Sequence, residues 1–464
     1  MDRIVKDDKV ELQDSDAWEV LGYSFPTWRK WQILIVVFFI QISINTNASM
    51  YSHAAAGVHK QYGVSEQVAR IPQMAFLIAY AFANNFATYV VCRTLGGLST
   101  AGGSVTLGVL ADMWEPDEQE FAVAFLVLSS VGGSVVGAII GAFVEEHLPL
   151  PWIFWIQLII GGFVQFVHLV CIPETRSTIL LDREAKRRRK TGKDPNVYGP
   201  NEIRGGHKIT LKEIRTIFWR PFYMFFTEPI VLWLSLLSGF SDALIFTFLE
   251  GFKPVYSQWE FGTVGIGLAF IPILIGYILA YLSYMPSINT FPQIWWLLFL
   301  APLLTIGLFG FAWTSLGPTH GVPWIAPMIF STIIAMANYA IYQSSIDYKT
   351  AAYGLYAASA TGGNDLARDF LAGVAAMYST PLYKNIPGRP VQYASTILAS
   401  LAFVVTIPIY VVYKKGPEIR AKSKFAQSLD KRFSERKEKR RKSSVVGLET
   451  GSGEKERKQH REHV

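Results

Sequence analysis

Long apolar runs separated by polar segments make up most of the chain. Five runs precede residue 173, at about 31–51, 68–84, 87–111, 121–144 and 152–172, and six follow residue 221, at about 223–251, 262–284, 294–314, 322–345, 353–381 and 394–413. Most are near the roughly 20 residues that an α-helix needs to cross about 30 Å of hydrocarbon. The pattern predicts an all-α, polytopic membrane protein with about 11 apolar segments.

The polar segments divide this pattern into five parts. We expect a cytosolic N-terminal tail at 1–30, an N-terminal helical bundle at 31–173, a cytosolic central loop at 174–221, a C-terminal six-helix bundle at 222–413 and a basic, disordered cytosolic tail at 414–464. The end of the central loop is patterned as an amphipathic helix on the membrane surface. Two bundles joined by a long charged loop are typical of an internally duplicated transporter.

Clusters of Lys and Arg predict the topology. They occur at 29–30, 183–190 and 414–442, and basic segments remain in the cytosol. Six runs separate the second and third clusters, which agrees with this placement, but five separate the first and second, which does not. Either one run does not cross or the N-terminal half lacks a helix, and the anomaly falls within 71–113.

Composition supports a membrane protein. Hydrophobic residues make up 51% of the chain and charged residues 17%, against about 25% charged in soluble domains. We interpret the net charge of +7 as membrane topology, with attraction to anionic lipid and no nucleic-acid partner. Cys92 and Cys171 lie in apolar runs, so no disulfide framework is expected. The polar first 30 residues do not resemble a cleavable signal peptide.

Arg93 is the first candidate for proton coupling. It lies in the apolar, glycine-rich stretch from Tyr89 to Trp114, and no Lys or Arg follows it until Arg176. An arginine within hydrocarbon costs at least about 2.5–3.5 kcal/mol and therefore needs a cavity or a partner. The alternative is that Arg93 lies at a helix end and extends into the headgroups.

Asp242 and Glu250 are the other candidates for proton coupling. Both lie in the run at 223–251, eight residues apart and therefore on similar faces of one helix. A carboxylate in a low dielectric favours its protonated form, as proton coupling requires. The alternatives are that Asp242 lies at a helix end and that Glu250 lies at the outer membrane interface.

Uncharged polar side chains within the runs are candidates for lining a substrate cavity. They are Gln41, Asn45, Asn47, Gln157, Gln165, Asn338, Tyr342 and Gln343. Each can instead form an interhelical hydrogen bond. Asn364, Arg368 and Asp369 form a further polar cluster, for which we expect a packing or gating role.

The sequence does not indicate an enzyme. It contains no HExxH, P-loop or G-x-S-x-G motif, and His53 and His59 lack a third metal ligand. We therefore expect no cofactor and no metal. Without a nucleotide-binding domain, transport would be driven by an ion gradient.

Several motifs resemble the major facilitator superfamily, and within it the fungal drug:proton antiporters with twelve spans, including relatives similar to polyamine exporters. They are C-R-T-L-G-G-L-S-T-A around Arg93, A-D-M-W-E-P at 111–116, P-E-T-R-S-T-I-L-L-D-R-E-A-K-R at 173–187, F-T-E-P-I at 226–230 and A-Y-G-L-Y-A-A-S-A at 352–360. The resemblance covers about residues 28–425. It implies the major facilitator fold of two helical bundles.

Two departures from the family pattern concern the N-terminal half. The antiporter motif G-x-x-x-G-P-x-x-G-G retains Gly133, Gly137 and Gly141 but has Ala138 for proline and Ala142 for the last glycine. The charged loop between the family's second and third helices is absent, together with most of the third helix by resemblance. A faulty gene model, a splice variant and a degenerate transporter each explain this absence, and both termini are cytosolic if the helix is restored.

The resemblance implies a secondary active transporter, with proton-coupled efflux of drugs, polyamines or secondary metabolites by alternating access. Its partners would be a small-molecule substrate, protons and the lipid bilayer, and the protein would be a monomer of the fungal plasma membrane. One alternative is an uncoupled facilitator or uptake transporter of the same superfamily. Another is a transport-incompetent relative that acts as a sensor or interaction protein.

Overall fold

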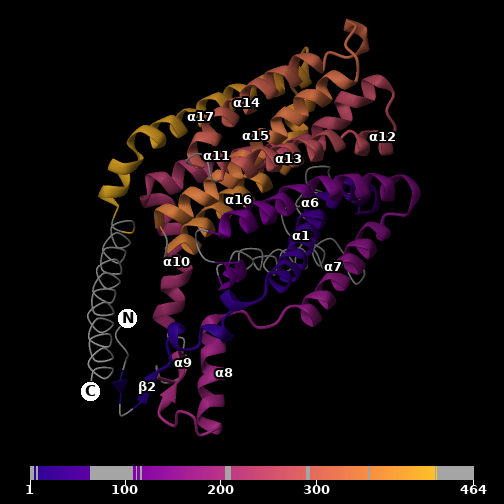
Figure 1. The fold of residues 1–464 in the computed structure, drawn as a ribbon. Helices are drawn as coiled ribbons and strands as arrows, with labels where there is room; N and C mark the ends of the chain where they lie inside the picture. The colour runs from indigo at the N-terminus through magenta and orange to yellow at the C-terminus, as the bar shows by residue number, and fades with distance from the viewer. Residues whose placement is uncertain are drawn as a thin grey trace, which may run out of the picture.

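The computed structural model describes residues 5–6, 9–62, 108–110, 112–114, 118–203, 211–288, 293–353, 356–423 and 425. These residues form long helices in two layers, with α1, α6 and α7 on one side of the molecule and α11 to α17 on the other (Figure 1). The helices expected at 68–84 and 87–111, and with them Arg93, lie outside the described residues.

In the N-terminal layer the described residues form three long helices, which are α1 (Thr27–Tyr62), α6 (Gln119–His147) and α7 (Pro151–Cys171). Pro151 occupies the first turn of α7, where its missing N–H leaves no helical bond unmade. Over the most apolar stretch of each helix, 72% of α6 is buried but only 17% of α7. Helix α6 is therefore central, whereas α7 presents side chains such as Phe163 and Leu169 outward.

The C-terminal layer is built from seven helices. They are α11 (Pro229–Tyr256), α12 (Thr263–Leu268), α13 (Ile271–Tyr284), α14 (Gln293–Thr314), α15 (Ile325–Tyr353), α16 (Ala357–Lys384) and α17 (Pro390–Lys422). Helix α11 packs mainly on α16, and α14 packs on α15. Short 3-10 turns η6 (Ser257–Trp259), η7 (Met285–Ser287) and η8 (Pro318–His320) lie between them.

Eight helices in the described part of the chain are long and apolar enough to cross a membrane. This confirms the predicted all-α, polytopic architecture. Helix α16, expected as a span at 353–381, is as long as the others but is not among the eight. It carries Asp365, Arg368 and Asp369 within one turn and a half.

The N-terminal segment is folded against the central loop. Strands β1 (Val5–Lys6) and β2 (Lys9–Glu11) pair antiparallel, and β2 pairs parallel with β3 (Val197–Tyr198). The turns η1 (Asp14–Asp16), η2 (Trp18–Val20) and η3 (Gly22–Ser24) follow, beside α8 (Ser177–Lys190) and α9 (Pro200–Ile203). A small apolar core joins the two segments through Leu12, Ala17, Leu21, Leu180, Leu181 and Ala185.

Helix α10 (Leu211–Thr227) links this module to the C-terminal layer. Its hydrophobic residues gather on one side, so the helical part of the amphipathic prediction is confirmed. It lies at the end of the bundle where α17 ends and runs across the direction of the bundle helices (Figure 1). A helix in this orientation is suited to the membrane surface.

Candidate functional site

A buried ion pair lies at the middle of α11. Nη2 of Arg368, on α16, is 3.0 Å from Oδ1 of Asp242, and the two side chains are 10% and 15% exposed. The two helices approach so closely here that a Cβ on Gly239 would lie only 2.8 Å from the carbonyl oxygen of Ala367. The glycine therefore allows the carboxylate and the guanidinium to meet.

A third helix supplies a further contact to Arg368. The Cζ of Arg368 lies 3.7 Å from the ring centroid of Tyr342, on α15, a distance at which the negative ring face attracts a cation. The guanidinium is thus held by a carboxylate and a π face from two different helices. Such pairing is required for a buried charge, because an uncompensated one costs several kcal/mol.

A second buried cation, Lys349, lies further along the same three helices. The Nζ of Lys349 donates to Oδ1 of Asn364 and, at 3.3 Å, to Oγ of Ser235. Lys349 is fully buried, and no carboxylate of the described residues lies within ion-pair distance of it. A buried ammonium held only by neutral oxygens is energetically costly.

The Arg368 contacts and the Lys349 contacts form two successive levels along the same three helices. Ser235 and Asp242 are seven residues apart on α11, as are Tyr342 and Lys349 on α15, while Asn364 and Arg368 are four apart on α16. These spacings put each pair on one face. A third level lies at Glu228, seven residues before Ser235. There the Tyr353 hydroxyl donates to Oε2 of Glu228 at 3.1 Å.

We call this array the polar column, defined by Glu228, Ser235, Asp242, Tyr342, Lys349, Tyr353, Asn364 and Arg368. The 14 residues from Glu228 to Asp242 span about 21 Å of helix. The column therefore extends from the end of α11 nearest α10 to its middle. It combines two acids, two bases, an amide and three hydroxyl groups within one helical bundle.

The structure places the predicted coupling residues differently. Asp242 is in the ion pair at the middle of α11, so it is not at a helix end. Glu250 lies two turns further along α11, half-buried and outside that ion pair. Arg93 lies outside the described residues.

The predicted cavity residues fall into separate places. In the C-terminal layer, Asn338 donates to Oγ of Ser241 at 2.8 Å, next to Asp242, and Tyr342 belongs to the polar column. Gln343 is fully buried and its amide donates to Asp347 at 2.8 Å. Only Asn338 and Tyr342 of this group therefore adjoin the ion pair.

In the N-terminal layer the predicted cavity residues bond locally or between helices. Gln41 donates to Oγ of Ser130 at 3.3 Å, and Asn45 donates to the Gln41 carbonyl of its own helix at 2.9 Å. Gln157 donates to the Asn47 carbonyl at 3.5 Å. Gln165 is exposed on α7 and contacts His168 of the same helix. These residues do not converge on one point.

Asp347 is a buried acid that sequence reasoning missed. Its Oδ2 accepts hydrogen bonds from the Tyr284 hydroxyl at 2.6 Å and from Gln343 at 2.8 Å. The apolar run at 322–345 ends before Asp347 and Lys349, so hydropathy does not include either residue in a helix. Helix α15 continues to Tyr353, because these charged groups face protein partners that satisfy them.

The antiporter-motif glycines pack against α1. A Cβ on Gly133 would lie 2.8 Å from the Ile42 carbonyl oxygen, and one on Gly137 would lie 2.0 Å from Oγ of Ser49. Gly141 faces the ring of His53 in the same way. The row permits contact between the helix backbones, and the Thr46 hydroxyl donates to the Gly133 carbonyl at 3.0 Å.

The substitution of the last motif glycine is accommodated on another helix. The Cβ of Ala142 would lie only 2.4 Å from a Cβ on Gly267 of α12. The methyl group of Ala142, which a glycine at this motif position would lack, therefore fits because residue 267 is a glycine. The motif glycines and Ala142 together pack α6 between α1 and the C-terminal layer.

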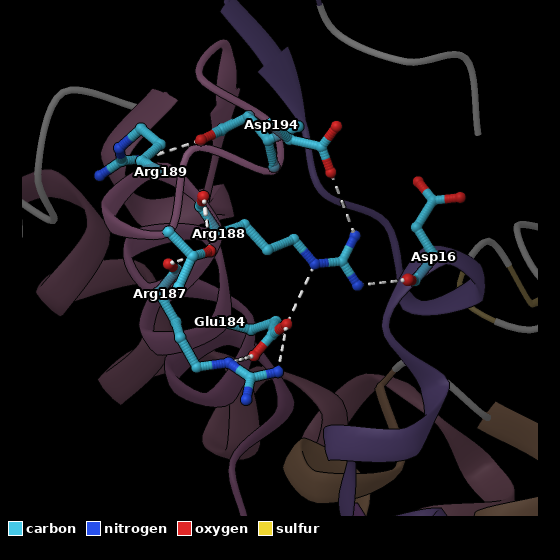
Figure 2. A network of polar contacts seen from close by, with 8 residues as sticks. Asp16, Glu184, Arg187, Arg188, Arg189 and Asp194 are labelled. Carbon is cyan, nitrogen blue, oxygen red and sulfur yellow. Dashed lines mark hydrogen bonds and ion pairs between the residues drawn. The ribbon is translucent and has the colours of Figure 1, made fainter.

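A polar network holds the folded N-terminal segment on α8 (Figure 2). Glu184 accepts from Nε of Arg187 at 2.8 Å and Nε of Arg188 at 3.0 Å, while Nη2 of Arg188 donates to the Asp16 carbonyl at 2.8 Å. The hydrogen bond from Arg187 is the main cause that holds the pKa of Glu184 below its ordinary value. Likewise, the hydrogen bond from Arg189 lowers the pKa of Glu202.

The chain is similar to fungal transporters over most of its length. It is 28% identical over 418 residues to the transporter paaT of Penicillium rubens, covering 86% of this chain and 73% of that protein. It is 24% identical to the cycloheximide resistance protein of Candida maltosa, covering 87% and 83%. It is 25% identical to the multidrug transporter FLU1 of Candida albicans, covering 88% and 74%.

The family pattern gives the same assignment over a continuous part of the chain. The Major Facilitator Superfamily pattern matches residues 62–368, which is more than half of the 464 residues. That interval includes α6, α7 and α11 as well as the ion pair between Asp242 and Arg368. The protein is therefore a multi-pass membrane transporter, and not an enzyme, and it belongs to the Major Facilitator Superfamily.

Proposed function

We propose that this chain exports small organic molecules in exchange for protons, by alternating access, as a monomer of the plasma membrane. The observation that carries the proposal is the buried ion pair between Asp242 and Arg368, at the middle of a spanning helix. Intramembrane ionisable residues are costly and are retained mainly at ion and substrate pathways. Similarity to proteins named for multidrug transport and cycloheximide resistance supports the direction of export.

Asp242 is the proposed proton carrier. When it is ionised, it pairs with Arg368 and closes α11 onto α16. When a proton neutralises it, the charge attraction is lost and Arg368 retains only the Tyr342 ring among the contacts described above. A protonation event can in this way bias two arrangements of the helices, which is the coupling that antiport requires.

The polar column is the proposed route for that proton. Glu228 begins the column near α10, and Lys349 lies between Glu228 and Asp242. Lys349 bonds to the neutral oxygens of Ser235 and Asn364, and we propose that it exchanges a proton with a neighbouring group. The route would connect one side of the membrane to the middle of the bundle.

The proposed substrate site lies where the two layers meet. The Tyr339 hydroxyl of α15 donates to the Ala124 carbonyl of α6 at 2.9 Å and joins the layers. Asn338 and Tyr342 flank it on α15. Apolar surroundings with a few fixed polar groups suit a drug-like molecule of mixed polarity.

The test compares D242N with E250Q in proteoliposomes that contain the purified full-length protein. Uptake of labelled cycloheximide and of ethidium is measured with an acidic lumen and without a pH gradient. We expect the gradient to accelerate uptake by the wild type and by E250Q, whereas D242N should transport at one rate in both conditions. If D242N still responds to the gradient as the wild type does, Asp242 is not the carrier.

A second candidate is an uncoupled facilitator of the same superfamily. It is favoured by the absence of proline from α6, which runs from Gln119 to His147 with Ala138 at the position of the motif proline. An uninterrupted helix lacks a ready kink for gating. Transport by the wild type at equal rates with and without the pH gradient would favour this candidate.

A further inference from the structure

A basic, aromatic pocket lies outside the proposed transport site. It is formed by α10, by the residue before α16 and by the residue beyond the end of α17, and it has a volume of about 650 Å³. Its lining residues are Arg215, Thr216, Trp219, Arg220, Tyr223, Tyr356 and Phe425. This volume is within the range of pockets that bind small molecules.

Within the described ranges, no acid pairs with the positive charge of the pocket. Among side chains that the structure describes, no carboxylate lies within ion-pair distance of Arg215 or Arg220. The arginines at 187–189 on α8, in contrast, all pair with Glu184 or Glu202. Two guanidiniums in one pocket, neither paired with a described acid, favour an anionic ligand.

The pocket also has an aromatic side. The Cζ of Arg220 lies 5.4 Å from the centroid of Tyr356, and the Tyr356 ring packs edge-on against Phe425 at 5.1 Å. The Arg220 guanidinium therefore lies over a ring, and its planar group can still receive a phosphate at its edge. This arrangement fixes Arg220 before any ligand arrives.

An exposed apolar stripe continues from the pocket along α10. Trp219, Tyr223 and Phe226 are 62%, 52% and 72% exposed and are spaced four and three residues apart, so they share one face. Aromatic side chains at this spacing are typical of a helix that lies in the membrane interface. Trp219 and Tyr223 belong both to this stripe and to the pocket.

We infer that this pocket binds the headgroup of an anionic phospholipid. The headgroup phosphate would lie between Arg215 and Arg220, and the acyl chains would follow the stripe from Trp219 to Phe226. Two positive charges at the start of an apolar path match a ligand that is anionic at one end and apolar at the other. Basic pockets beside spanning helices bind such headgroups.

The experiment measures lipid binding by native mass spectrometry of the full-length protein in detergent. Phosphatidylserine is titrated onto the wild type, the R215Q/R220Q variant and the K414Q/K415Q variant, with phosphatidylcholine as the uncharged control. The control variant loses the same charge from exposed lysines near the end of α17, outside the pocket. The thermal midpoint of each variant is recorded to establish that it is folded.

We expect R215Q/R220Q to weaken phosphatidylserine binding by about tenfold to thirtyfold, since each basic residue contributes about 1 kcal/mol. K414Q/K415Q should bind as the wild type does. Equal losses in the two variants would show non-specific attraction and would overturn the inference, as would no loss in either. Complete displacement of the lipid by millimolar inorganic phosphate would also overturn it, because the ligand would then be a soluble anion.

Discussion

At the scale of single residues, Arg368 retains its charge in the core because two other helices supply partners. Asp242 gives it a carboxylate at 3.0 Å, and Tyr342 gives it a ring face at 3.7 Å. Removal of either partner leaves a guanidinium that is only partly compensated in a low dielectric. The two partners therefore make separable contributions, one through charge and one through the π face.

Substitution of Tyr342 separates these contributions. Y342F keeps the ring face, so we expect its transport rate and thermal midpoint to remain close to the wild-type values. Y342L removes the face and should lower transport by about thirtyfold, in line with the roughly 2 kcal/mol of a desolvated cation–π contact. Uptake of ethidium into proteoliposomes measures the rates. Equal rates for Y342F and Y342L would exclude the cation–π contact as a contributor.

Part of the polar column could be predicted from residues alone. Asp242 and Tyr342 are candidates from the sequence because a polar group within an apolar run needs a partner, and Arg368 and Asn364 stand out as a polar cluster. Which groups meet depends on the rotation of three helices about their axes, which one sequence does not specify. Lys349 was missed because hydropathy falls where a charge occurs, even though the helix continues.

At the scale of elements, the glycine row of α6 determines how closely α1 packs. G137A should be destabilising, because its Cβ would lie 2.0 Å from Oγ of Ser49 and 2.5 Å from the Thr46 carbonyl oxygen. The helices must then separate, at a cost of about 1–3 kcal/mol. We expect a lower thermal midpoint for the purified protein.

The neighbouring glycine provides the control for this prediction. A Cβ on Gly132 would meet only Cδ1 of Leu274, at an ordinary distance of 3.6 Å. G132A should therefore leave the thermal midpoint nearly unchanged. If G132A and G137A lower it equally, close packing of α1 on α6 is not the reason for the glycine row.

The module of the N-terminal segment and α8 should depend on pH through Glu184. Its pKa is lowered in the folded state, so its contribution to stability is present above the unfolded value, about 4.3, and is lost as the pH falls through the folded value. We expect hydrogen–deuterium exchange, corrected for intrinsic rates, to show a docked segment at neutral pH and an undocked one well below pH 4.

At neutral pH, E184Q should reproduce part of the acid effect. It removes the charge that Arg187 and Arg188 share, and the protection of residues 9–25 should fall by about tenfold. E19Q changes an exposed acid of the same segment and should leave protection unchanged. Undiminished protection in E184Q would mean that the apolar core alone docks the segment.

The helices themselves were largely predictable, whereas this docking was not. Apolar runs at 121–144 and 152–172 became α6 and α7, because length and hydropathy determine a spanning helix. Strand β2 has three residues and pairs with β3, far away in the sequence. A strand this short has no periodicity to detect, so its partner depends on the tertiary fold.

At the scale of the whole molecule, the proposed alternating access requires the two layers to move relative to each other. They meet at the hydrogen bond from Tyr339 to the Ala124 carbonyl and where Gly267 of α12 approaches Ala142 of α6. The ion pair between Asp242 and Arg368 lies within the C-terminal layer, so its protonation can change the shape of that layer at the contact. The odd number of runs before residue 173 and the role of Arg93 stay predictions, since both concern residues outside the described part of the chain.

Proton exchange is the central claim, and proton flux measures it most directly. Purified protein is placed in liposomes that contain a pH-sensitive dye and have an acidic lumen, and ethidium is added outside. We predict that the lumen becomes alkaline as ethidium enters, at a matching rate, and that D242N abolishes the alkalinisation. Entry of ethidium into wild-type liposomes without any change of luminal pH would contradict proton-coupled export.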